Sequence, residues 1–124
     1  MTAIKFYRIA HALYLKHIPL LPKFFYRLIY FVNNCHVHYA TEIGEGTTIA
    51  YGGVAVVIHK NATIGKNCVI ESNVTIGGRN NIPAAPVIGD NVFIAPDCGF
   101  HTAGHPIDAV RRNQGLEYAY PITV

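Results

Sequence analysis

The fold is decided by residues 57–77, which read VIHKNATIGKNCVIESNVTIG. An isoleucine recurs at every sixth position in this run and beyond it, at 58, 64, 70, 76, 82, 88 and 94, and Phe100 keeps the same phase. A helix repeats every 3.6 residues and a strand every two, so neither element alone explains a period of six. A β-helix explains it, because each hexad supplies one short strand and one turn.

In such a solenoid each isoleucine points inward and stacks on the matching residue of the next coil. A small residue follows several of these aliphatic positions, as in Ile64-Gly65 and Ile76-Gly77, where the chain turns. Glycine and asparagine tolerate a positive φ at turns. Four asparagines fall at turn positions, spaced by multiples of six: Asn61, Asn67, Asn73 and Asn91.

Three interruptions of the repeat are the places where binding groups are expected, since insertions in a solenoid project from it. The phase slips by three residues between Ile49 and Ile58. Residues 77–86 are rich in Gly, Pro and Asn and are expected to loop out. The largest interruption covers residues 101–120, after which residues 121–124 resemble a resumed strand.

The N-terminal segment has a different character. Apolar residues spaced close to 3.6 predict a helix over 3–16, Pro19 and Pro22 interrupt it, and a second helix is predicted over about 22–33. We therefore divide the chain into helices in 1–34 and a β-helix in 35–124. Five basic residues precede Glu42, the first acid: Lys5, Arg8, Lys16, Lys23 and Arg27. They form either a solvated helical face or a contact with a membrane surface or an acidic partner.

Composition excludes several classes of protein. The 124 residues are 51% hydrophobic with a net charge of +3, typical of a single globular domain. Three widely spaced cysteines argue against a disulfide framework and a zinc ribbon, and fit the cytoplasm. The apolar stretch 18–32 is too short and too charged to span a bilayer. Neither nucleotide-cradling glycine motif is present, and nothing indicates nucleic-acid binding.

The chain resembles the hexapeptide acyltransferases, the superfamily that includes serine acetyltransferase and the galactoside and maltose O-acetyltransferases. Residues 1–95 resemble the short serine-acetyltransferase-like proteins, through residues 18–22 (IPLLP), 56–59 (VVIH) and 73–79 (NVTIGGR). Residues 87–124 resemble the galactoside and maltose enzymes instead, through residues 88–96 (IGDNVFIAP), 102–108 (TAGHPID), 112–113 (RN) and 115–118 (GLEY).

The resemblance implies an all-β fold, a left-handed parallel β-helix with a short N-terminal helical segment. It also implies acetyl-CoA as co-substrate, no metal, and a homotrimer with active sites between neighbouring chains. Three hexads then form one triangular coil, in which the faces are Ile64, Ile82 and Phe100; Ile58, Ile76 and Ile94; and Ile70 and Ile88.

Two departures accompany the resemblance. Tyr51 stands where serine acetyltransferases have a histidine. The chain stops at Val124, so we expect C-terminal coils to be missing, from either a fragment or a junction of two related sequences.

His105 is the candidate general base, because it matches the family's catalytic histidine and lies in the largest interruption. Histidine suits the removal of a proton from an alcohol near neutral pH. His59 is the second candidate. Five residues are expected to contact the acceptor or to assist: Tyr51, Asn73, Arg79, Asp108 and Glu117. His36-x-His38 and the His101–His105 pair lack an obvious third metal ligand.

Three functions stay open. The first is an O-acetyltransferase acting on a sugar, a glycoside or serine. The second is a non-catalytic or truncated β-helix that serves in assembly. The third is a peripheral membrane enzyme that modifies a lipid-linked sugar and is anchored by its basic N-terminal helices.

Overall fold

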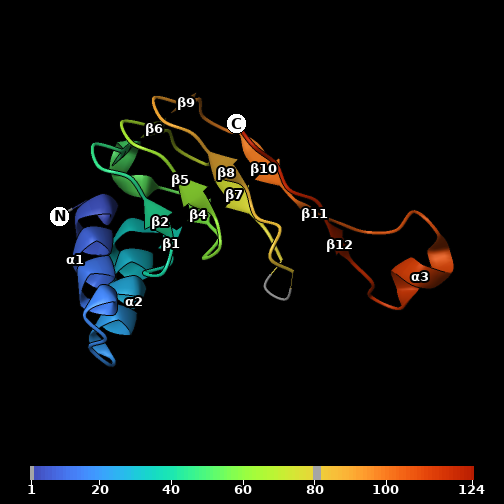
Figure 1. Cartoon of the computed structure of the whole chain (residues 1–124), viewed down its shortest axis with the longest axis horizontal. Helices are drawn as coiled ribbons and strands as arrows, with labels where there is room; N and C mark the ends of the chain where they lie inside the picture. Colours follow the sequence, from blue (N-terminus) through green and yellow to red (C-terminus); the bar gives the residue numbers. More distant parts are fainter. Residues whose placement is uncertain (1, 80–81) are drawn as a thin grey trace.

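The computed structural model describes residues 2–79 and 82–124, which form a left-handed parallel β-helix capped by two helices (Figure 1). The helices are α1 (Ala3–Leu15) and α2 (Leu21–Asn33). No helix in the described part of the chain is long and apolar enough to cross a bilayer.

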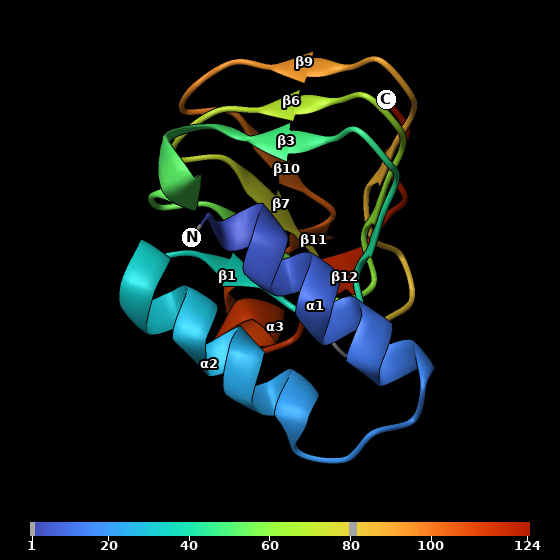
Figure 2. The ribbon, with the colours of Figure 1, turned by 90° about the vertical axis from the view of Figure 1, so that its left-hand side faces the viewer.

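Two-residue and three-residue strands form three parallel sheets, one on each side of the coil. The strands of these sheets are, in spatial order, β1 (His36–Val37), β4 (Val57–Ile58), β7 (Thr75–Gly77) and β10 (Gly99–His101); β2 (Glu42–Ile43), β5 (Thr63–Ile64) and β8 (Val87–Ile88); and β3 (Thr48–Ile49), β6 (Val69–Ile70) and β9 (Phe93–Ile94). Figure 2 shows β3, β6 and β9 stacked above one another. The sheets share one core of buried aliphatic residues, most of them the isoleucines of the hexads.

The predicted slip of three residues is confirmed. Val37 pairs with Ile58, 21 residues later, whereas Ile58 pairs with Ile76, 18 residues later. The short helical turn η1 (Ala50–Gly53) holds the extra residues, with Tyr51 at φ +52° and Gly52 at φ +67°. This turn packs against the start of α1, since a Cβ on Gly53 would lie 3.0 Å from that of Ala3.

The predicted faces are wrong beyond Ile76. Phe100 pairs with Ile76, Ile88 with Ile64, and Ile94 with Ile70. Residues between β7 and β8 leave the coil and take up one whole hexad. The period of six therefore survives while each later isoleucine moves to the next face. Ile82, predicted to be inward, lies outside every strand and is partly exposed.

Three of the four turn asparagines adopt a positive φ, namely Asn67, Asn73 and Asn91. Asn61 does not, and its backbone N–H donates instead to Nδ1 of His59 over 3.1 Å. The resumed strand is confirmed: Thr123 forms a parallel bridge with Val87, and the Gly89 N–H donates to the Val124 carbonyl over 2.8 Å.

Helices α1 and α2 cover the first coil, whose outer edge has no preceding coil to pair with (Figure 2). Arg8 donates to the carbonyls of Ile43 and Gly44, each over 2.5 Å, and Tyr7 donates to the Thr41 carbonyl. A sheet edge left uncovered would invite pairing with another chain. One of the five basic residues thus has a structural role, while Lys5, Lys16, Lys23 and Arg27 are exposed.

Candidate functional site

The predicted loop 101–120 contains regular structure and extends from the end of the β-helix opposite to α1 and α2 (Figure 1). Strand β11 (Ala103–Gly104) pairs antiparallel with β12 (Tyr118–Ala119), and the short helix α3 (Ala109–Asn113) lies between them. A Cβ on Gly104 would lie 2.7 Å from Cζ of Tyr118. Only glycine therefore lets the Tyr118 ring pack on this backbone, immediately before His105.

Three predicted site residues come together beside this hairpin. Nε2 of His105 lies 3.7 Å from Oε1 of Glu117, beyond a hydrogen bond but within range of electrostatic attraction. The other carboxylate oxygen of Glu117 is paired with the Arg79 guanidinium. Glu117 is the least exposed of the three, at 23% of its side chain, against 48% for His105. Arg79 reaches it from the loop that follows β7, so two interruptions of the repeat meet here.

Two other predicted residues have structural partners. Asp108 caps α3, with its Oδ2 accepting the backbone N–H of Arg111 over 3.0 Å. Nδ2 of Asn73 donates to Oδ1 of Asp97 over 2.7 Å, which links equivalent turns of successive coils. The side chains of both residues are therefore engaged within the fold, away from the His105–Glu117 pair.

Tyr51 and His59 lie apart from His105. Tyr51 is 76% exposed on η1, which packs against the start of α1 at the far end of the molecule (Figure 1). His59 follows β4, and its Nδ1 accepts a backbone N–H. The neutral ring consequently carries its proton on Nε2. This tautomer makes His59 a donor, which argues against its use as a general base.

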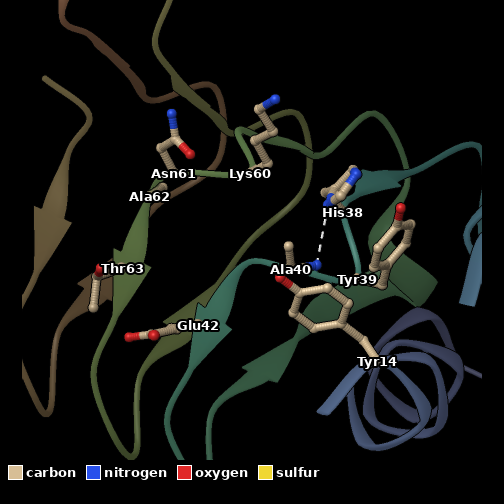
Figure 3. Close-up of a pocket in the computed structure, with 9 residues that line it drawn as sticks. All are labelled: Tyr14, His38, Tyr39, Ala40, Glu42, Lys60, Asn61, Ala62 and Thr63. Carbon is tan, nitrogen blue, oxygen red and sulfur yellow. Dashed lines mark hydrogen bonds between the residues drawn. The ribbon is translucent and has the colours of Figure 1, made fainter. Parts of the chain in front are cut away.

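The hollow part of the surface lies elsewhere, at the corner that follows β1 and β4. A cleft of about 540 Å³ is shown in Figure 3 and adjoins a second of about 450 Å³, with His38 and Lys60 in both walls. The first also contains Tyr14, Tyr39, Ala40, Glu42, Asn61, Ala62 and Thr63, and the second Tyr26, His36, Val57, Ile58, His59, Gly77 and Gly78.

Sequence reasoning considered His36 and His38 only as a metal pair and missed this groove. The signal that could have found it is the spacing of His38 and His59, 21 residues apart. That is the length of the slipped coil, so the two rings occupy the same turn position in successive coils. Within residues 2–79 and 82–124, no group of three His, Cys, Asp or Glu side chains is placed to hold a metal ion.

Burial changes the acidity of two residues near the groove and the helices. The pKa of His38 is lowered, first by burial and then by the positive charges of Lys60, His36 and His59. Burial raises the pKa of the Cys35 thiol to about 12, so this cysteine stays a thiol rather than a nucleophilic thiolate.

The comparisons with known proteins divide as the two halves of the sequence do. No profile of a known protein family matches the chain. It is 30% identical over 94 residues to a serine acetyltransferase of Synechococcus elongatus, covering 74% of this chain and 38% of that protein. It is 38% identical over 64 residues to the galactoside O-acetyltransferase of Escherichia coli, covering 52% and 30%. The chain thus spans about a third of the length of these relatives.

Solved structures agree. The serine acetyltransferase of Neisseria gonorrhoeae in complex with serine superposes with a TM-score of 0.72 at 31% identity, over 78% of this chain and 40% of that one. A serine acetyltransferase in complex with CoA gives a TM-score of 0.68 at 25% identity, over 78% and 39%. With the hexad repeat, the coil geometry and these relatives together, the chain belongs to the hexapeptide-repeat acyltransferase superfamily.

Proposed function

We propose that this chain belongs to an acetyl-CoA-dependent O-acetyltransferase that acts on a hydroxyl of a small acceptor, with His105 as general base. The observation that carries the proposal is the meeting of His105, Glu117 and Arg79 beside the β11–β12 hairpin. The relatives support the reaction class, since two of them are named for acetyl transfer to serine or to galactosides. The CoA complex of a structural neighbour supports the donor.

The roles of the three side chains follow from their arrangement. Glu117 lies nearest to Nε2 of His105, which favours the tautomer with its proton on Nε2 and the free electron pair on Nδ1. Nδ1 then takes the proton of the acceptor hydroxyl, and the developing imidazolium is stabilised by the Glu117 carboxylate. Arg79 holds that carboxylate in place through its ion pair.

The reaction balances without a covalent enzyme intermediate. The acceptor oxygen forms a bond to the thioester carbonyl carbon while its proton passes to His105. The carbon–sulfur bond then breaks, and the imidazolium returns the proton to the leaving thiolate, which releases CoA and the acetyl ester. The acceptor is a sugar, a glycoside or serine. We further propose a homotrimer, in which neighbouring chains complete the site.

Release of free thiol from acetyl-CoA, measured with a panel of sugars, glycosides and serine, tests the proposal. His105→Ala should reduce turnover by about 10²–10⁴-fold, the range for loss of a general base. His17→Ala, at an exposed position in the turn between the helices, is the matched control and should keep full activity. Absence of turnover with every acceptor, or full activity of His105→Ala, would favour a non-catalytic assembly protein instead. Light scattering in solution tests the trimer separately.

A further inference from the structure

The groove formed by the two clefts around His38 and Lys60 is larger than anything beside His105, and the mechanism above leaves it unused. Its walls come from four parts of the chain: α1, α2, and the turns after β1 and β4. In Figure 3 Lys60 and Asn61 stand on one side of the first cleft, and His38 and Tyr39 on the other. A concave site with a few converging polar groups is the usual form of a small-molecule site.

The local backbone fixes His38 as a hydrogen-bond donor. The backbone N–H of Ala40 donates to Nδ1 of His38 over 3.0 Å, drawn as the dashed line in Figure 3. The neutral ring therefore carries its proton on Nε2, as the ring of His59 does one coil later. Two histidines in the same turn position thus present N–H groups, which suit an acceptor-rich ligand.

The charge in the groove is positive. The ammonium group of Lys60 and the rings of His36, His38 and His59 gather there. Lys23 and Arg27 of α2 border a smaller cleft of about 210 Å³ that also contains His38. Among the described residues that line these three clefts, the one acid is Glu42, which lies beside Thr63 and away from Lys60 (Figure 3). A doubly charged phosphoryl group, with three acceptor oxygens, matches several cationic donors better than a neutral hydroxyl does.

The remaining walls suit a sugar ring. Tyr14, Tyr39 and Tyr26 present flat aromatic faces with polar ends, and Asn61 and Thr63 add amide and hydroxyl groups. Aromatic rings of this kind pack against the C–H face of a ligand while their hydroxyls remain in water.

The groove also leads toward the candidate catalytic residues. Its second cleft reaches Gly77 and Gly78, and the Gly78 backbone lies against the His59 ring, with an added Cβ only 3.4 Å from it. Arg79 comes next in the chain and pairs with Glu117 beside His105. A ligand held at Lys60 therefore lies on the same corner of the β-helix as the proposed general base.

We propose that the His38–Lys60 groove binds the phosphoryl group of a phosphorylated saccharide, with its sugar ring on the tyrosines. That this saccharide is the acetyl acceptor rests on the proposed function; that the groove binds it does not. The proposal therefore assigns a ligand class to a site that lies outside the His105 cluster.

Calorimetric titration of the full chain with glucose 1-phosphate, glucose and inorganic phosphate tests the site without any turnover. We expect glucose 1-phosphate to bind more tightly than either fragment. Lys60→Met should weaken its binding about tenfold, the effect of losing one charge-assisted hydrogen bond. Lys66→Met is the matched control, because Lys66 is exposed, follows Ile64 as Lys60 follows Ile58, and lies outside both clefts. It should bind as the unaltered chain does.

Two results would overturn the proposal: glucose binding as tightly as glucose 1-phosphate, or equal weakening by Lys60→Met and Lys66→Met. Vesicles with and without phosphatidic acid separate the two sources of a phosphoryl group. Lys60-dependent binding to phosphatidic acid vesicles, with no binding of glucose 1-phosphate, would keep the phosphoryl site and overturn the saccharide as its carrier.

The test is independent of the proposed function. His105→Ala should bind glucose 1-phosphate normally while losing acetyl transfer. Normal binding together with no turnover of any acceptor would refute the enzyme and leave the groove standing. Acetyl transfer to uncharged sugars without glucose 1-phosphate binding would refute the groove alone.

Discussion

The Tyr7 hydroxyl donates a hydrogen bond to the Thr41 carbonyl and so joins α1 to the first corner of the β-helix. Both residues are fully buried. Burial raises the pKa of Tyr7 to about 12, which keeps the hydroxyl protonated and able to donate throughout the neutral range. The cap formed by the helices is therefore fixed by a buried polar contact as well as by apolar packing.

Tyr7→Phe should destabilise the protein by about 1–2 kcal/mol, because it leaves the buried Thr41 carbonyl without this donor. Tyr30→Phe, at a position that is 50% exposed, removes the same atom and should change the free energy of unfolding by less than about 0.5 kcal/mol. Denaturation by urea measures both values. Equal effects of the two substitutions would show that the buried contact is unimportant.

Ile76 and Ile82 belong to the same sequence repeat but lie in different environments. Ile76 is fully buried in β7, whereas Ile82 lies in the loop that follows. Ile76→Ala should cost about 2–5 kcal/mol of stability through the cavity it leaves. Ile82→Ala should cost less than about 1 kcal/mol. A large cost at Ile82, measured by the same denaturation, would contradict the looped-out path of the chain.

This contrast shows what the hexad pattern can and cannot predict. The period of six predicts a β-helix because the core needs one inward residue for each strand, and the slip before Ile58 is visible as a change of phase. The loop after β7 is invisible to the pattern, because its length equals one hexad and every later residue keeps its phase. Hence Phe100, Ile88 and Ile94 were assigned to the wrong faces.

The candidate site divides in the same way. His105, Glu117 and Arg79 were selected separately, and their meeting depends on how two loops project from the coil. Neither loop has a repeat to predict its path. The groove was missed because Lys60 and His38 lie in separate coils and only the three-dimensional register brings them together.

Gly104→Ala tests how tightly the hairpin positions His105. An added Cβ would overlap the Tyr118 ring, and the displacement of Tyr118 would move the adjacent Glu117. Acetyl transfer should fall by about tenfold or more, since small displacements of catalytic groups are costly. Gly77→Ala is the control, because its added Cβ would meet neighbours at an ordinary 3.6 Å. Unchanged turnover by Gly104→Ala would argue against a role for this hairpin.

The helices carry a surface that is both apolar and basic. Leu20, Phe24 and Phe31 are 77%, 58% and 80% exposed, and Lys23 and Arg27 lie among them in the sequence. If this surface contacts membranes, the chain should sediment with anionic vesicles at low salt and be released at high salt. Phe31→Ser should weaken this binding, and Ile107→Ser, at the 98% exposed residue of the far loop, should not. Absence of sedimentation at low salt would remove the membrane proposal.

His38 should make stability depend on pH. Its pKa in the folded protein lies below the ordinary value of 6.5, through burial first and the charges of Lys60, His36 and His59 second. The unfolded chain therefore binds more protons at His38 than the folded protein does in the interval below pH 6.5. Stability gained from the neutral ring is present above pH 6.5 and is lost as the pH falls through that interval.

His38→Asn removes the titrating ring while leaving an amide oxygen that can accept the Ala40 N–H. The unaltered chain should lose more stability than this variant when the pH falls from 7.5 to 5. An NMR titration of the His38 ring gives the second measurement: its pKa should rise in Lys60→Met, because one positive neighbour is removed, and stay unchanged in Lys66→Met. A His38 pKa that is the same in all three proteins would show that Lys60 does not act on this ring.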